Sequence, residues 1–111
     1  MRAPPERVLK AVEMLLDALE ERGVRVEEAY LFGSYARGDW IESSDVDLVI
    51  VSSSFQGFRF TDRLELIYRI EGELGVKPWI EVIPLTPSEL QERLATSVVI
   101  RDASKYWIKV K

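Results

Sequence analysis

The sequence predicts an α+β fold in which a small mixed β-sheet has helices packed against it. Three observations lead to this prediction. Helical and strand-like apolar patterns alternate along the chain. The first two predicted strands have only a short connection, which favours antiparallel pairing, and a full helix separates the second from the third, which is typical of a crossover between parallel strands. Since 111 residues is the length of one domain, we expect a single domain over residues 1–111.

The first predicted element is an N-terminal helix. Its apolar positions recur at helical spacing, two prolines precede it and Gly23 stands where a C-terminal cap belongs; the periodic positions are Val8, Val12, Leu15 and Leu19. A short buried strand is predicted over residues 29–32, followed by a turn and one helical turn over residues 35–40. The run 46–51 (VDLVIV) is apolar on both faces, which predicts a central strand.

The second half of the chain continues the alternation after a loop. Residues 61–74 predict a helix by their apolar spacing, and residues 79–84 (WIEVIP) predict a third strand. Thr86 and Glu89 have the spacing of a capping box, which predicts the start of another helix. Residues 106–110 alternate as an edge strand does.

The composition excludes several classes of protein and of site. Apolar residues make up 47% of the chain and charged residues 31%, as in an ordinary globular protein. With no cysteine and no histidine, a metal would have to be held by oxygen atoms, which favours Mg²⁺, Mn²⁺ or Ca²⁺ over Zn²⁺. The net charge of −4 does not favour direct nucleic-acid binding.

The apolar runs are too short for a membrane span, and the N-terminal ten residues (MRAPPERVLK) lack the apolar core of a signal peptide. We therefore expect a cytoplasmic protein with no membrane partner.

Two carboxylates stand at the opening of the second predicted strand. Asp45 and Asp47 are two residues apart, so both project from one face of the strand. Neighbouring carboxylates repel each other, and a divalent cation relieves that repulsion. Glu81 would join them if the third strand lies beside the second, which would give an all-oxygen site for one or two Mg²⁺ ions.

A glycine and a hydroxyl end the first predicted strand. Gly33 and Ser34 would let backbone amides approach an anion closely, and Arg37 is suited to bidentate capture of a phosphate. Each feature alone also has an ordinary explanation: a turn, a solvated strand end, a surface arginine and an exposed strand glutamate. The combination of phosphate-binding and metal-binding features favours a site.

The spacing Gly33-Ser34, ten residues, then Asp45-Val46-Asp47 resembles the signature of the DNA-polymerase-beta-like nucleotidyltransferases. The run GSYARGDWIESSDVDLVIV is similar in particular to their minimal single-domain prokaryotic members, which are often paired with a HEPN-domain protein in toxin–antitoxin modules. The resemblance implies the nucleotidyltransferase fold. It is specific over residues 29–51 and weaker but consistent from there to Glu89.

The resemblance also implies roles for six residues. Asp45, Asp47 and Glu81 would bind the catalytic Mg²⁺ ions, for which Mn²⁺ could substitute. Glu81 departs from the Asp that small members more often carry there. Gly33 and Ser34 would hold the terminal phosphates of ATP or another NTP, with Arg37 near them.

The activity implied is Mg²⁺-dependent transfer of an NMP, AMP from ATP, onto an acceptor hydroxyl of a HEPN-family partner, so that the chain acts as an antitoxin. Because the chain has no added domain to grip an acceptor, a partner or a dimer interface would supply that contact, which leaves a homo-oligomer open. The alternative is an inactive antitoxin of the same fold that neutralises its partner by binding. Aromatic residues would then form the interface, and the candidates are Trp40, Trp79, Tyr106 and Trp107.

Overall fold

The computed structural model describes residues 2–111, in which five α-helices and one 3₁₀ helix surround four strands. No helix in this range has the length and apolarity that crossing a membrane requires. In chain order the elements are α1 (Glu6–Glu21), β1 (Glu28–Phe32), α2 (Ser34–Arg37), β2 (Val46–Val51), η1 (Ser53–Phe55), α3 (Phe60–Leu74), β3 (Ile80–Leu85), α4 (Pro87–Thr96), α5 (Val98–Ser104) and β4 (Ile108–Lys109).

The four strands form one mixed sheet in the order β3-β2-β1-β4. β1 pairs antiparallel with β2, and β2 pairs parallel with β3, as the connection lengths predict. The registers place Phe32 opposite Asp47 and Asp47 opposite Glu81. The predicted mixed sheet with packed helices is therefore confirmed, and three polar strand ends meet at one end of it.

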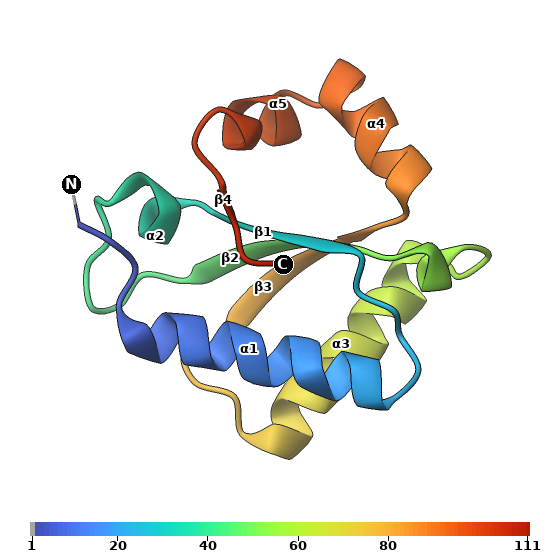
Figure 1. The fold of residues 1–111 in the computed structure, drawn as a ribbon, viewed down its shortest axis with the longest axis horizontal. Coiled ribbons are helices and arrows are strands. Elements are labelled where there is room, and N and C mark those ends of the chain that lie inside the picture. The colour runs from blue at the N-terminus through green and yellow to red at the C-terminus, as the bar shows by residue number, and fades with distance from the viewer. Residues whose placement is uncertain (1) are drawn as a thin grey trace.

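Helices cover both faces of the sheet (Figure 1). α1 and α3 lie on one face, where the larger core gathers their apolar sides with alternate residues of β2 such as Leu48 and Ile50. α4 and α5 lie on the other face over a smaller core that includes Val49 and Val51. Since side chains alternate along β2, Asp47 points to the same face as Val49, toward α5.

The structure differs from the sequence predictions mainly in the C-terminal third. The helix that begins at Pro87 ends at Thr96, and Ser97, with extended backbone, caps a separate helix by accepting a hydrogen bond from the Ile100 amide. The predicted edge strand over residues 106–110 shortens to Ile108–Lys109. The helical turn predicted to reach residue 40 ends at Arg37, because Gly38 adopts a left-handed conformation.

The free edge of β3 is closed by side chains of α3. In a parallel pair the backbone amide and carbonyl of every second residue point away from the neighbouring strand. In β3 the residues whose backbone groups point outward are Ile80, Val82 and Pro84. The Ile80 amide donates to Glu71 Oε1 at 2.9 Å and the Val82 amide donates to the Tyr68 hydroxyl at 3.2 Å. Pro84 has no amide hydrogen to donate. These bonds fix the backbone on either side of Glu81.

The Glu71 carboxyl that takes part in this closure is fully buried. Burial raises its pKa to about 7, although the hydrogen bond from the Ile80 amide opposes the rise. An amphipathic helix therefore places a titratable group inside the core, directly behind the strand that carries Glu81.

A buried arginine joins α3, β3 and α4. Arg63 donates to the Pro84 carbonyl at 3.1 Å and to the two Glu89 carboxylate oxygens at 2.6 and 3.2 Å. Glu89 also accepts from the Thr86 amide in the capping box that starts α4, as predicted. Arg63 lowers the pKa of Glu89, so the pair is ionised at neutral pH. One guanidinium thus sets the position of the first turn of α4.

We expect Arg63→Ala to lower the free energy of unfolding by about 2–4 kcal/mol, because it removes the donor of the Pro84 carbonyl and the cation that pairs with the Glu89 carboxylate. Urea unfolding measures this change. Arg59→Ala is the matched control, since Arg59 makes an exposed ion pair with Asp62 and should cost less than about 0.5 kcal/mol. Equal costs for the two variants would contradict the role given to Arg63.

Candidate active site

A cleft of about 570 Å³ opens at the end of the sheet where β1 finishes and β2 begins. Its walls come from the β1–α2 junction, the start of β2, and α5 with the segment after it. The lining residues are Phe32, Gly33, Ser34, Arg37, Asp45, Asp47, Val98, Val99, Asp102 and Tyr106. Five of the six predicted site residues therefore meet in one cleft, although up to fourteen positions separate them in the chain.

Gly33 is the residue that lets the Asp47 carboxylate enter this cleft. Its φ of 74° lies in the left-handed region, and a Cβ built on it would overlap Asp47 Oδ2 and come within 3.1 Å of Asp47 Cγ. The register explains the contact, because Phe32 pairs with Asp47 and Gly33 follows Phe32. Glycine is thus required here both for backbone conformation and for space.

Asp45 and Asp47 lie on one wall of the cleft, as the sequence predicts. The pKa of Asp47 is raised to about 6, mainly by burial and then by repulsion from the Asp45 and Glu81 carboxylates, while the Arg37 guanidinium opposes the rise. Negative charge therefore accumulates at this point without a basic side chain close enough to neutralise it. A bound cation would relieve that repulsion.

Glu81 lies beside this pair without lining the cleft. The parallel register sets it opposite Asp47, on the same face of the sheet, and its side chain is exposed at the edge strand. In residues 2–111, no three acidic side chains are gathered closely enough to hold a metal ion as they stand. The carboxylates that line the cleft itself are therefore Asp45, Asp47 and Asp102 of α5.

The short helix α2 borders the cleft next to Asp47 and carries Arg37, the one basic side chain among the lining residues. The Ser34 and Tyr35 amides lie before the first intrahelical hydrogen bonds, in which the Ala36 and Arg37 amides donate to the Gly33 carbonyl. Arg37 Nε donates to Asp39 at 3.2 Å and its Nη1 donates to the Tyr106 hydroxyl at 3.1 Å. Both contacts are exposed, so an anion of higher charge can compete for the guanidinium.

Sequence reasoning missed the wall contributed by α5 and the segment after it. Val98, Val99 and Asp102 line the cleft from α5, and Tyr106, which the sequence points to only as an interface aromatic, binds Arg37 there. Local patterns give no signal for this contact, because it joins segments more than 50 residues apart. The Ser97 cap is the one local feature that could have shown a separate helix here.

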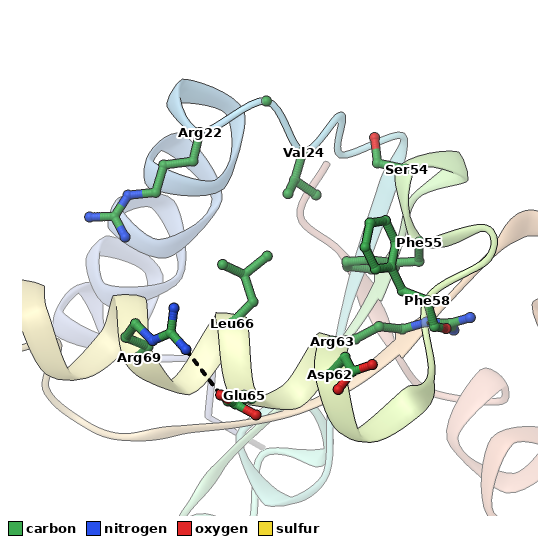
Figure 2. Close-up of a pocket in the computed structure, with 11 residues that line it drawn as sticks. Arg22, Val24, Ser54, Phe55, Phe58, Asp62, Arg63, Glu65, Leu66 and Arg69 are labelled. Atoms are coloured by element: carbon green, nitrogen blue, oxygen red, sulfur yellow. Dashed lines mark hydrogen bonds and ion pairs between the residues drawn. The ribbon is translucent and has the colours of Figure 1, made fainter.

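A second cleft, of about 490 Å³, lies at the opposite end of the sheet, before β1 and after β2 (Figure 2). Val24, Phe55 and Leu66 point into it. Its charged groups are paired with one another or with neighbours: Arg69 with Glu65 at 3.0 Å, Arg22 with Glu73 at 2.7 Å, and Arg63 with Glu89. Because these charges are already compensated, the first cleft is the stronger candidate for chemistry.

We expect Gly33→Ala to lower the free energy of unfolding by about 2–4 kcal/mol, because strain at positive φ adds to the overlap with Asp47. Gly23→Ala is the matched control: Gly23 has a φ of 87° and nothing within 4 Å of an added Cβ, so only backbone strain applies. In an Asp47→Ala background the cost of Gly33→Ala should fall toward that of Gly23→Ala. An unchanged cost in that background would show that the Asp47 contact is not responsible.

The raised pKa of Asp47 predicts a pH dependence of stability in metal-free protein. Between pH 4 and about 6 the folded state binds more protons than the unfolded state, so the free energy of unfolding falls as pH rises through this window. Asp47→Asn removes this contribution. The free energy of unfolding of the variant, relative to that of the parent, should therefore be about 1–2 kcal/mol higher at pH 7 than at pH 4. Chemical unfolding at both pH values with a chelator present measures the effect, and Asp62→Asn is the control.

This chain is similar to a known domain family, to two named proteins and to several solved structures. The nucleotidyltransferase domain profile matches residues 12–108. Two Methanocaldococcus jannaschii proteins match in part: "Putative protein adenylyltransferase MJ0604" is 50% identical over 44 residues, and "Putative protein adenylyltransferase MJ1379" is 42% identical over 53 residues. The first match covers 38% of this chain and 43% of the relative, and the second covers 48% and 53%. The similarity therefore spans about half the length of each relative.

Solved structures share the fold. The crystal structure of "a putative nucleotidyltransferase from Sulfolobus solfataricus" has a TM-score of 0.66 at 24% identity, covering 93% of this chain and 78% of that one. A structure described as "the toxin-antitoxin with AMP-PNP" has a TM-score of 0.59 at 18% identity, covering 93% and 72%. Since the domain profile spans nearly the whole chain and the cleft carries the expected residues, this protein belongs to the nucleotidyltransferase domain family.

Proposed function

We propose that this nucleotidyltransferase moves AMP from ATP onto a hydroxyl of a partner protein in a Mg²⁺-dependent reaction. The observation that carries the proposal is the cleft whose lining brings Gly33, Ser34 and Arg37 together with Asp45 and Asp47. The first group supports the binding of phosphate and the second supports the binding of a cation, within a single space.

The residues present fit a divalent cation. Asp45 and Asp47 supply only oxygen donors, their repulsion raises the pKa of Asp47, and the missing Cβ of Gly33 leaves the Asp47 carboxylate free to face the phosphate-binding turn. Mg²⁺ is commonly held by one or two carboxylates together with substrate phosphates, and the Asp45 and Asp47 carboxylates fit this mode of coordination. When bound, the ion would supply charge neutralisation at the phosphates and at the attacking oxygen.

The phosphate-binding wall would hold the leaving group. The Ser34 and Tyr35 amides at the start of α2, the Ser34 hydroxyl and the Arg37 guanidinium would donate to the β- and γ-phosphate oxygens. As the bond between the α-phosphorus and the bridging oxygen breaks, negative charge grows on the pyrophosphate. Donors already fixed by the Gly33 turn stabilise that charge without rearranging.

The acceptor hydroxyl would approach from the side of the α-phosphate opposite the pyrophosphate. Its oxygen forms the new bond to the α-phosphorus, and its proton goes to a carboxylate. Glu81 is placed for that proton, because it stands opposite Asp47 at the exposed edge of the sheet. The hydrogen bonds from the Ile80 and Val82 amides to α3 would keep the backbone at Glu81, and so this carboxylate, in a fixed position near the reacting phosphate.

A protein acceptor is supported by the relatives. Two partly matching proteins are named as protein adenylyltransferases, and one structure of similar fold is described as a toxin–antitoxin with AMP-PNP. The resemblance to minimal nucleotidyltransferases adds a HEPN-family protein as the partner. Modification of that partner would make this chain an antitoxin.

We expect Asp45→Asn/Asp47→Asn to abolish both Mg²⁺-dependent binding of AMP-PNP and transfer of label from [α-³²P]ATP to a HEPN-family partner protein. Calorimetry with Mg²⁺ and with EDTA measures the binding, and gel autoradiography measures the transfer. Label from [γ-³²P]ATP should not transfer, because pyrophosphate leaves. Asp62→Asn, an exposed carboxylate at the other cleft, should behave as wild type. Transfer that survives in the double variant would contradict the proposal.

A second candidate function is neutralisation of the partner by binding alone, which the position of Glu81 outside the cleft lining favours. Of the four aromatic residues that the sequence marks for such an interface, Trp79 is 42% exposed. Trp40 is buried against Tyr35 and is therefore wrong as an interface residue, and Trp107 stacks on Tyr30 with ring centroids 4.1 Å apart. Under this function, partner silencing would persist in Asp45→Asn/Asp47→Asn.

A further inference from the structure

Two valines on the first turn of α5 form an exposed apolar wall of the cleft. Val98 is 78% exposed and Val99 is 61% exposed, the first and third highest values among the large apolar side chains in residues 2–111. Both line the cleft that holds Asp45 and Asp47. Apolar side chains this exposed inside a charged cleft have no role in holding phosphate or metal.

This wall is held in place by the rest of α5. Ile100 is buried in the smaller core, Ala103 is also buried, and the Ser97 hydroxyl caps the helix by accepting from the Ile100 amide. The helix is therefore anchored through one side while the two valines face outward. An anchored apolar surface of this kind can bind a flat ligand without first becoming ordered.

The valines and the phosphate-binding residues come from different elements around the cleft. Val98 and Val99 lie on α5 with Asp102, whereas Arg37 lies on α2 beside Gly33 and Ser34. A nucleotide has anionic phosphates at one end and an aromatic base at the other. With its phosphates at Gly33, Ser34 and Arg37, as proposed above, its base would extend toward the valines of α5. A volume of about 570 Å³ lies within the range that accommodates a whole ligand of this size.

We propose that Val98 and Val99 pack against the base of the bound nucleotide; this inference rests on the proposed function. Valine side chains carry no hydrogen-bonding atoms, so they respond to the area of the base and not to the pattern of donors and acceptors on its edge. The cleft then selects purine over pyrimidine nucleotides by contact area and discriminates weakly between adenine and guanine.

The test is a calorimetric titration in Mg²⁺ of wild type, Val98→Ser/Val99→Ser and Ile41→Ser, with AMP-PNP, GMP-PNP, UMP-PNP and inorganic tripolyphosphate. Ile41 is the matched control, since it is 64% exposed and apolar but does not line the cleft. We expect the valine variant to bind AMP-PNP about tenfold more weakly and tripolyphosphate equally well. In wild type, AMP-PNP and GMP-PNP should agree within about threefold, and UMP-PNP should bind more weakly.

Two results would overturn the inference alone: unchanged AMP-PNP affinity in the valine variant, or an equal loss for tripolyphosphate, which carries no base. Urea unfolding of each variant separates a lost contact from a lost fold, and Val99→Phe provides a second check because a larger flat side chain should hold or tighten AMP-PNP binding. If wild type fails to bind AMP-PNP while remaining folded, the proposed function fails together with the inference. If AMP-PNP binds and requires Asp45 and Asp47 but not the valines, only the inference fails.

Discussion

The register of β1, β2 and β3 is the constraint on which the cleft depends. It sets Phe32 against Asp47 and Asp47 against Glu81, so that three strands deliver polar groups to one end of the sheet. A slip of one residue in β2 would turn Asp47 into the core between the sheet and α1 and would turn the fully buried Leu48 to the face that α4 and α5 cover. Because an unpaired carboxylate in that apolar core is costly, packing protects the alignment of the carboxylates.

The site works against the stability of the fold that holds it. Burial raises the pKa of Asp47, and the register that aligns the carboxylates adds repulsion from Asp45 and Glu81. Gly33 likewise has a positive φ and leaves no room for a Cβ beside the Asp47 carboxylate. Desolvation and repulsion are thus concentrated where a cation and phosphates would be bound, as is common at functional sites.

Much of the fold could be predicted from local patterns, because periodic apolar residues determine α1, β2, α3 and β3. Their observed ends fall within a residue or two of the predicted ones. The motif from Gly33 to Asp47 is also local, so five of the site residues could be placed before the structure was known. The burial of Arg63 and Glu71 could not be predicted, since charged residues on an amphipathic helix normally face solvent.

The α5 wall of the cleft escaped prediction for a related reason. Val98 and Val99 occupy positions that, in an uninterrupted helix, would be taken as part of an apolar stripe. The extended backbone at Ser97 rotates them out of that stripe and toward Asp45 and Asp47. Position in space, and not residue type, gives them a place in the site.

The closed edge of β3 has a consequence for how the molecule meets other proteins. An open edge strand recruits further strands, from partners or from misfolded copies, through its free amides and carbonyls. Here the outward amides of Ile80 and Val82 are bonded to Glu71 and Tyr68, the Pro84 carbonyl is bonded to Arg63, and Pro84 offers no amide. These contacts oppose the addition of a further strand at this edge, so a protein that approaches Glu81 has to be recognised through side chains and shape.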